Sequence, residues 1–240
     1  MVKITIDNQK VEVEPGSTVL DAARKAGIYI PTLCYHESLS PSGACRLCAV
    51  EVATNGKFEL TSACTYPVAE GLKVRTDSEK VVQARRLAME LILAERPHST
   101  KIEELASKLA VAEPSFTLPE QECILCGLCV RACHEIVGAD AVNFIAQGLN
   151  RDMEQPFVRH SEERCIGCDS CAYICPTEAI TVVDSGDTRT LTTPSGKIEF
   201  KLKKCSVCGR YWAPEKQLEY VAQQANIPLD TFDTCLDCRD

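Results

Sequence analysis

The sequence predicts an α+β protein built from several small domains in series. Sixteen cysteines occur in 240 residues, and most of them have C-x2-C spacing. Aromatic residues make up only 5% of the chain, so part of the core is expected to form around metal–sulfur centres. The N-terminal residues alternate between apolar and polar as strands do, whereas residues 77 to 97 follow a helical period. Together these observations indicate strands, helices and cysteine-rich loops in turn.

Residues 1 to 76 are expected to form a β-grasp domain. Val2 to Ile6 and Val11 to Glu14 alternate on either side of a turn at Asp7-Asn8, which predicts a hairpin. Thr18 then provides a helix N-cap, with the carboxylate of Asp21 three residues later. A hairpin, a helix and a cysteine loop in this order are typical of a β-grasp ferredoxin domain.

Four cysteines of this domain are the candidate ligands of one [2Fe-2S] cluster. Their spacing is C-x10-C-x2-C-x15-C, which differs from the C-x4-C-x2-C run of plant ferredoxins. They are Cys34, Cys45, Cys48 and Cys64. Zinc accepts four thiolates equally well and is the alternative on spacing alone. The cluster is favoured because further cluster motifs follow, and zinc has no redox chemistry.

Residues 77 to 116 are expected to form a helical spacer that packs under the first domain. Apolar residues fall on one helical face until Pro97, namely Val81, Val82, Leu87, Ala88, Leu91 and Ile92. A shorter helix is predicted from Ile102 to Val111. His98 is interpreted as a solvated or capping histidine, because no cysteine lies between Cys64 and Cys123 to complete a metal site.

Residues 117 to 186 contain the most specific motif, two copies of C-x2-C-x2-C-x3-C separated by about thirty residues. This is the pattern of bacterial ferredoxins with two [4Fe-4S] clusters, in which the fourth cysteine of a copy binds the other cluster. The sequence therefore predicts two interleaved sites. The first is expected to use Cys123, Cys126, Cys129 and Cys175. The second is expected to use Cys133, Cys165, Cys168 and Cys171.

Residues 187 to 240 are expected to form a small metal-binding module. Thr188 to Thr193 and Ile198 to Leu202 predict a hairpin, and a helix should run from Pro214 to Ala225. Two C-x2-C pairs bracket this helix with the spacing C-x2-C-x26-C-x2-C, namely Cys205, Cys208, Cys235 and Cys238. The spacing favours a zinc-ribbon-like site with one tetrahedral zinc, and a further iron–sulfur cluster is the alternative.

Charge and hydropathy exclude two classes of partner. The formal net charge of −8 argues against a nucleic-acid surface, because such surfaces concentrate lysine and arginine. The most apolar run, Leu87 to Ala94, contains Glu90 and is too short to insert directly into a membrane. Met1 to Asp7 has no apolar targeting stretch, so we expect a cytoplasmic chain whose cysteines bind metal rather than form disulfides.

The stretch from Val2 to about Val183 resembles the iron–sulfur subunit on the NADH-oxidising side of NAD-linked hydrogenases and of complex I. The matching phrases are Pro31-Thr32-Leu33-Cys34, Gly43-Ala44-Cys45-Arg46-Leu47-Cys48 and Cys123-Ile124-Leu125-Cys126-Gly127-Leu128-Cys129-Val130-Arg131-Ala132-Cys133. That family usually places a histidine and three cysteines between the two domains to hold another [4Fe-4S] cluster. Only His98 remains here, so we expect this additional cluster to be absent. The C-terminal pairs are similar to the tail of ferredoxin-like subunits in formate hydrogenlyase-type complexes.

The resemblance implies single-electron transfer between a flavin-bearing NAD(P)H-oxidising subunit and a catalytic subunit. The complex would be a hydrogenase, a formate dehydrogenase or a flavin-based electron-bifurcating assembly. No G-x-G occurs in the sequence, so a dinucleotide-binding loop and a catalytic centre are expected on other chains. The alternatives are a free-standing polyferredoxin and a zinc-ribbon binding module, of which the second explains only the C-terminal residues.

Overall fold

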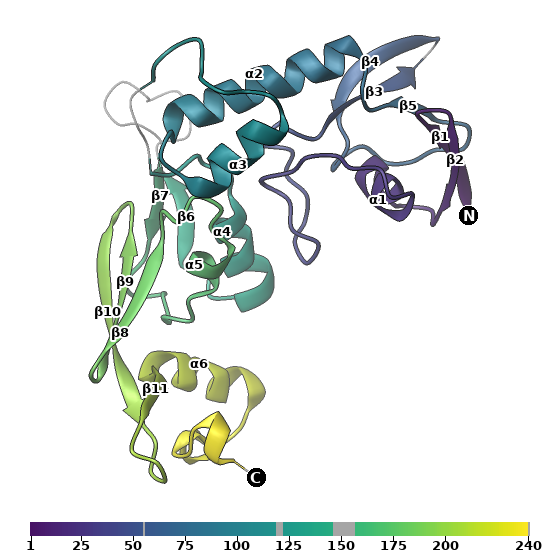
Figure 1. The fold of residues 1–240 in the computed structure, drawn as a ribbon. Helices are drawn as coiled ribbons and strands as arrows, with labels where there is room; N and C mark the ends of the chain where they lie inside the picture. Colours follow the sequence, from purple (N-terminus) through teal and green to yellow (C-terminus); the bar gives the residue numbers. More distant parts are fainter. Residues whose placement is uncertain (55, 119–121, 146–156, 240) are drawn as a thin grey trace. The chain divides into compact units, whose positions relative to one another are not determined.

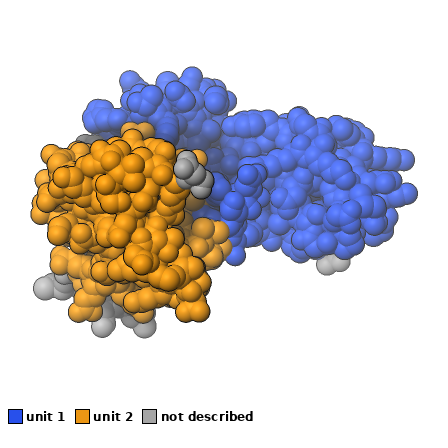
Figure 2. Space-filling view, turned by 90° about the horizontal axis from the view of Figure 1, so that it is seen from below, with its two compact units in different colours: residues 1–127 blue, residues 128–240 orange. Residues whose placement is uncertain are grey.

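The computed structural model describes residues 1–54, 56–118, 122–145 and 157–239. The chain divides into two compact units, residues 1–127 and residues 128–240 (Figure 2). Both units combine helices with β-sheet (Figure 1), which confirms the mixed α and β class. Within the described ranges, every helix is too short or too polar to cross a lipid bilayer.

A five-stranded sheet lies at the start of the first unit, in the order β2-β1-β5-β3-β4. Its strands are β1 (Val2–Ile6), β2 (Gln9–Val13), β3 (Ala49–Thr54), β4 (Lys57–Ser62) and β5 (Lys73–Arg75). Strand β1 pairs antiparallel with β2, as the predicted hairpin requires, and parallel with β5. Strand β5 was not predicted, because three residues are too few to establish an alternating pattern.

Helix α1 (Val19–Lys25) begins at the predicted N-cap. The Thr18 hydroxyl accepts a hydrogen bond from the Asp21 backbone N–H, and the Asp21 carboxylate accepts one from the Thr18 N–H at 2.8 Å. This reciprocal arrangement is a capping box. The helix packs its apolar side against the alternate, inward-facing residues of the sheet, and the two form one core with the cysteine loop.

Helices α2 (Glu79–Glu95) and α3 (Thr100–Lys108) pack against each other in the first unit (Figure 1). The face of α2 that they bury agrees with the prediction only in part. Val81 and Ile92 are buried as predicted. Val82, Leu87 and Leu91 were expected on the same face but are exposed, and Arg85 and Met89 are buried instead. The apolar pattern misplaced part of the face because it gives no weight to an arginine whose guanidinium finds a hydrogen-bond acceptor inside the protein.

The second unit begins with short helices and a hairpin around the cysteine motifs. These elements are α4 (Leu128–Arg131), the π-helical turn η1 (Ala132–Val137), β6 (Val142–Ile145), β7 (Phe157–His160) and α5 (Ser170–Ile174). Strands β6 and β7 pair antiparallel. The short helices contain Cys129, Cys133 and Cys171, and the segments that flank α5 contain the other cysteines of this region.

A four-stranded antiparallel sheet follows, in the order β11-β10-β9-β8. Its strands are β8 (Thr181–Ser185), β9 (Thr188–Thr193), β10 (Gly196–Lys204) and β11 (Tyr211–Pro214). The predicted hairpin corresponds to β9 and β10. The domain boundary expected between residues 186 and 187 falls in the turn between β8 and β9. Strands from both expected domains therefore belong to one sheet.

The C-terminal residues fold around helix α6 (Glu215–Ala225), which matches the predicted helix. Two 3-10 turns follow, η2 (Leu229–Phe232) and η3 (Leu236–Cys238). A small apolar core joins β11, α6 and η2, made of Ala213, Leu218, Ala222 and Phe232 with Trp212 packed against it. Trp212 therefore has a packing role in this core.

Candidate iron–sulfur and metal centres

The four cysteines of the first unit come together as two pairs. The Sγ atoms of Cys48 and Cys64 are 3.3 Å apart. Cys34 and Cys45 form the other pair, in which the Cys45 backbone N–H donates to the Cys34 Sγ at 3.3 Å. A [2Fe-2S] cluster divides four thiolates between two irons, so two pairs are the grouping that such a cluster requires.

Within each pair, a hydrogen bond between the two cysteines favours the thiolate form of one of them. The Cys45 thiol lowers the pKa of Cys34 to about 5, and the Cys64 thiol lowers the pKa of Cys48 to about 6. The same hydrogen bonds raise the pKa of Cys45 and of Cys64. Thiolates are the form that binds metal, so each pair already favours the loss of its first proton.

The helices of the spacer hold this cysteine loop in place. Leu47 lies between two of the candidate ligands and is fully buried. Its side chain packs into the core formed by Met89 and Leu93 of α2 and Ile102 of α3. These helices were predicted to pack under the first domain as a spacer, and they also fix the loop that would bind the [2Fe-2S] cluster.

Arg85 supports the same loop from the buried side of α2, and it was not predicted as a site residue. Its Nε and Nη2 atoms both donate to the Ala49 carbonyl oxygen, at 3.0 and 2.8 Å. Ala49 directly follows Cys48 in the sequence. The sequence could have indicated its position, because an arginine spaced four residues from both Val81 and Met89 lies on the same helical face as they do.

The first copy of the doubled motif is divided between the two units, with Cys123 and Cys126 in the first and Cys129 in the second. The Cys123 Sγ accepts a hydrogen bond from the Leu125 N–H at 3.4 Å. Ile124, between these ligands, packs on the α2–α3 core that also holds Leu47. One apolar core therefore supports a residue from each of two cysteine loops.

Cys129 and Cys175, the other two candidate ligands of the first [4Fe-4S] cluster, lie in the second unit. Cys129 is buried on α4, and the Cys175 Sγ lies 3.5 Å from the Thr177 hydroxyl oxygen.

The four candidate ligands of the second [4Fe-4S] cluster line a single cavity in the second unit. Cys133 comes from the first motif copy, and Cys165, Cys168 and Cys171 come from the second. Burial raises the pKa of Cys171 to about 12 and also raises the pKa of Cys133 and of Cys165. Isolated thiolates are therefore disfavoured here, and a cationic centre has to accompany their deprotonation. The Ala141 N–H donates to the Cys133 Sγ at 3.2 Å and stabilises a thiolate at that position.

C-terminal side chains hold the loops around this cavity. Arg189 donates from Nη1 to the Gly167 carbonyl oxygen at 3.0 Å, and the Tyr220 hydroxyl donates to the Val137 carbonyl oxygen at 2.9 Å. Gly167 has a φ of +74°, and a Cβ atom there would lie 2.9 Å from the Phe200 ring. Only glycine fits this position in the loop between Cys165 and Cys168.

The C-terminal cysteines form a compact four-sulfur group that can bind one metal ion. The Sγ atoms of Cys205, Cys208, Cys235 and Cys238 all lie within 4.8 Å of one another, and those of Cys208 and Cys235 are 3.8 Å apart. A tetrahedral ion with metal–sulfur distances of about 2.3 Å needs sulfurs about 3.8 Å apart. Hydrogen bonds from the backbone of Cys235 and Cys208 lower the pKa of Cys205 to about 6.

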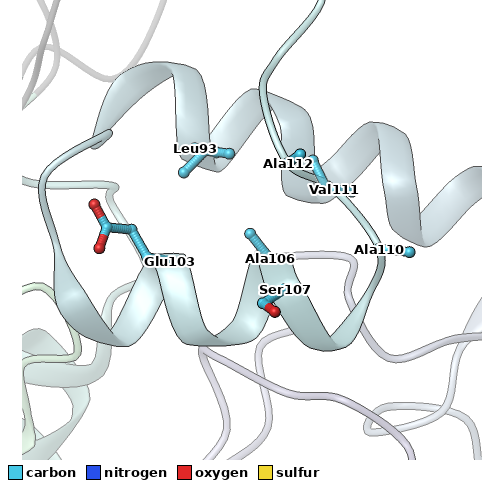
Figure 3. A pocket seen from close by; sticks show the side chains of 7 residues that line it. All are labelled: Leu93, Glu103, Ala106, Ser107, Ala110, Val111 and Ala112. Carbon is cyan, nitrogen blue, oxygen red and sulfur yellow. The ribbon is translucent and has the colours of Figure 1, made fainter.

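A further cavity of about 400 Å³ lies beside α2 and α3 and has a different character (Figure 3). Its lining contains one carboxylate and otherwise small or apolar side chains, namely Leu93, Glu103, Ala106, Ser107, Ala110, Val111 and Ala112. Because no cysteine lines it, this cavity lacks the thiolates that an iron–sulfur cluster or a four-cysteine zinc site requires.

Two known domain families match this chain. A 2Fe-2S iron-sulfur cluster binding domain matches residues 1–79, and a 4Fe-4S dicluster domain matches residues 117–182. Their order along the chain is the order that the cysteine motifs predict.

Individual relatives match about three quarters of this chain. An NADH-quinone oxidoreductase subunit of Rhizobium meliloti is 32% identical over 207 residues, which are 75% of this chain and 24% of that protein. NADPH-Fe(3+) oxidoreductase subunit alpha of Geobacter sulfurreducens is 35% identical over 202 residues, 74% of this chain and 24% of that protein. This chain thus spans about a quarter of the length of these curated relatives.

This chain also matches a solved structure, and the match covers most of the solved chain. The crystal structure of NAD+-reducing [NiFe]-hydrogenase in the H2-reduced state matches with a TM-score of 0.55 and 33% identity, covering 61% of this chain and 71% of that one. Because sequence, domain order and structure agree, the chain belongs to the iron–sulfur protein family that includes these oxidoreductase subunits and the matching chain of the NAD+-reducing hydrogenase.

Proposed function

We propose that this chain relays single electrons between a flavin-bearing NAD(P)H-oxidising subunit and a separate catalytic subunit. The catalytic subunit would belong to a hydrogenase, a formate dehydrogenase or an electron-bifurcating complex. NAD(P)H delivers a hydride, which carries two electrons, whereas an iron–sulfur cluster accepts one electron at a time. A flavin therefore has to stand between the nicotinamide and this chain, and the sequence contains no G-x-G loop to bind a dinucleotide.

The observation that most supports a relay is the shared α2–α3 core. Leu47 from the candidate [2Fe-2S] loop and Ile124 from the candidate [4Fe-4S] loop both pack on it. A rigid apolar core fixes the two loops relative to each other, because close-packed side chains resist displacement. Fixed loops suit electron transfer between centres that do not move.

The proposed cofactors are one [2Fe-2S] cluster, two [4Fe-4S] clusters and one zinc ion. The paired geometry of Cys34, Cys45, Cys48 and Cys64 supports the first. The cavity that Cys133 shares with cysteines of the second motif copy supports interleaved [4Fe-4S] sites. The close approach of the four C-terminal sulfurs favours a single ion over a cluster, since thiolates on different irons of a cluster stand farther apart. Zinc is the ordinary occupant of such a closed four-cysteine site.

Reduction by NADH in the presence and absence of the flavin subunit tests this proposal. The anaerobically purified chain alone should show no bleaching of its visible absorbance with NADH, and the chain copurified with its flavin subunit should bleach. Cys48→Ala should abolish the coupling, whereas Cys208→Ser at the C-terminal site should retain it. Robust NAD-linked redox activity of the single chain free of flavin would contradict the proposal. Failure of any companion chain to copurify would favour a free-standing polyferredoxin.

A further inference from the structure

Arg85 is a positive charge inside the first unit. Its side chain is on the α2 face that also presents Val81 and Met89, both fully buried, and the residue is 8% exposed. The guanidinium reaches the strand that leaves the [2Fe-2S] loop, where it makes its two hydrogen bonds to the Ala49 carbonyl oxygen. A backbone carbonyl satisfies two donors but does not neutralise a charge.

No carboxylate forms an ion pair with this guanidinium among the residues that the structure describes. The buried carboxylate of Glu51 lies 3.8 Å from the Lys80 ammonium instead. Arg189 in the second unit shows the usual arrangement, with hydrogen bonds of 2.7 and 2.9 Å to Asp184. Buried charges in proteins are normally paired, so an arginine without a carboxylate requires another source of negative charge.

The hydrogen bonds to Ala49, which directly follows Cys48, hold the guanidinium beside the cysteine site. Burial lowers the pKa of Arg85, and the Cys48 thiol is the ionisable neighbour that opposes this effect most, ahead of the carboxylates of Asp7 and Asp77. Arginine stays protonated in proteins, so the guanidinium remains a fixed cation. Four thiolates around a [2Fe-2S] core give a net negative centre, and reduction adds one further negative charge without adding a proton.

We propose that Arg85 balances the charge of the [2Fe-2S] cluster bound by Cys34, Cys45, Cys48 and Cys64 and thereby raises its reduction potential. This inference rests on the proposed cluster. A fixed cation in a low-dielectric interior stabilises the reduced form more than the oxidised form, because the reduced form is more negative. Arg85 exchanges neither electrons nor protons in this role. It is a positioning and potential-setting residue rather than a ligand.

The test is an anaerobic redox titration of the full chain, in which the [2Fe-2S] signal is followed by EPR. Arg85→Met removes the charge and keeps much of the side-chain volume, while Arg85→Gln also keeps an amide that can donate to the Ala49 carbonyl. At the wild-type midpoint potential, both variants should lower the ratio of reduced to oxidised cluster at least tenfold. This corresponds to a midpoint potential lower by about 59 mV for one electron. Arg85→Lys should shift the ratio less than threefold.

Arg86→Met is the matched control. Arg86 is the next residue of α2, is exposed, and donates to the Ala110 carbonyl oxygen at 3.2 Å. Its removal changes the net charge by the same amount and should leave the [2Fe-2S] midpoint unchanged. Equal shifts in the Arg85 and Arg86 variants would overturn the proposal.

Three further outcomes of the titration also test the role of Arg85. An intact signal with an unshifted midpoint in either neutral Arg85 variant would overturn it. Loss of the [2Fe-2S] signal from both neutral variants, with the [4Fe-4S] signals retained, would replace it with a role in cluster assembly. Absence of any [2Fe-2S] signal from the unmodified chain would instead contradict the proposed function.

Discussion

Cys133 belongs to the first copy of the cysteine motif but lines a cavity with cysteines of the second copy. The neighbouring Ala141 N–H donates to its sulfur, so the position is prepared for a thiolate although burial raises the Cys133 pKa. At the residue scale, this placement is what an interleaved pair of [4Fe-4S] sites requires. Spacing alone gave the same assignment, since the doubled motif is specific to this arrangement.

Cys133→Ser should therefore remove the cluster bound by Cys165, Cys168 and Cys171. The serine oxygen is a poor substitute for a thiolate on iron, and the loss should amount to about four irons per chain. Cys175→Ser is the matched variant and should remove the other [4Fe-4S] cluster. EPR spectra of the two reduced variants distinguish the clusters. If each variant instead lost the cluster of its own motif copy, the two sites would be independent.

Two residues that position the [2Fe-2S] loop were not predicted as site residues. Leu47 lies within a cysteine motif, where its apolar side chain gives no sign that it packs on helices from residues 79 to 108. Arg85 lies within a helix whose buried face the apolar pattern predicted only in part. Both roles depend on contacts between segments far apart in sequence, and spacing rules do not report such contacts.

At the scale of elements, the α2–α3 pair has a structural role beyond spacing two domains. It fills the space behind the cysteine loops with a close-packed apolar core, so substitutions in that core should be felt at the loops. The helices themselves were predicted from their period. Strands β5 and β11 were not, because each is too short to display an alternating pattern, and pairing with longer neighbours stabilises them.

Leu47→Ala should destabilise the first unit by about 2 to 5 kcal/mol, the usual range for a fully buried leucine. Leu87→Ala removes the same atoms from an exposed position of α2 and should change stability by no more than about 0.5 kcal/mol. Urea unfolding, followed by the visible absorbance of the [2Fe-2S] cluster, measures both. Similar effects from the two variants would show that Leu47 is not part of a packed core.

Gly167→Ala should disrupt the loop of the second [4Fe-4S] cluster, because the new methyl group would collide with the Phe200 ring as well as strain a positive φ. Gly186→Ala is the control, since Gly186 also has a positive φ, of +59°, but meets no atom within 4 Å. The control should cost about 1 kcal/mol from backbone strain alone. Iron analysis should find about four irons fewer in the Gly167 variant and none fewer in the control. Equal iron contents would refute the steric argument.

At the scale of the whole molecule, the C-terminal residues are a support for the second [4Fe-4S] site. The Lys216 ammonium donates to the carbonyl oxygens of Glu162 and Glu163 at 2.7 and 2.6 Å, just before Cys165. Helix α6, which contains Lys216, shares its small core with Phe232 near the C-terminal cysteines. The sequence predicted a separate metal module here, but it could not show that the module is joined to the cluster motif by a shared sheet and by these contacts.

Cys235→Ser should release the C-terminal metal and also shorten the lifetime of the second [4Fe-4S] cluster in air. Cys235 is 1% exposed, so its loss should free η3 and loosen α6 above the cluster loop. Metal analysis should give about one zinc fewer per chain. The [2Fe-2S] signal should decay in air at the unmodified rate, which serves as the internal control. If the second [4Fe-4S] cluster were equally stable in the variant and in the unmodified chain, the C-terminal metal site would not support that cluster.

The central claim is that this chain carries three one-electron centres, and a reductive titration with metal analysis tests it most directly. The anaerobically purified protein should contain about ten irons and one zinc, and it should take up about three electrons. The EPR signals should develop separately, one for the [2Fe-2S] cluster and one for each [4Fe-4S] cluster. About fourteen irons without zinc would reassign the C-terminal site and lengthen the relay. Uptake of one electron or none by the fully loaded protein would contradict the claim.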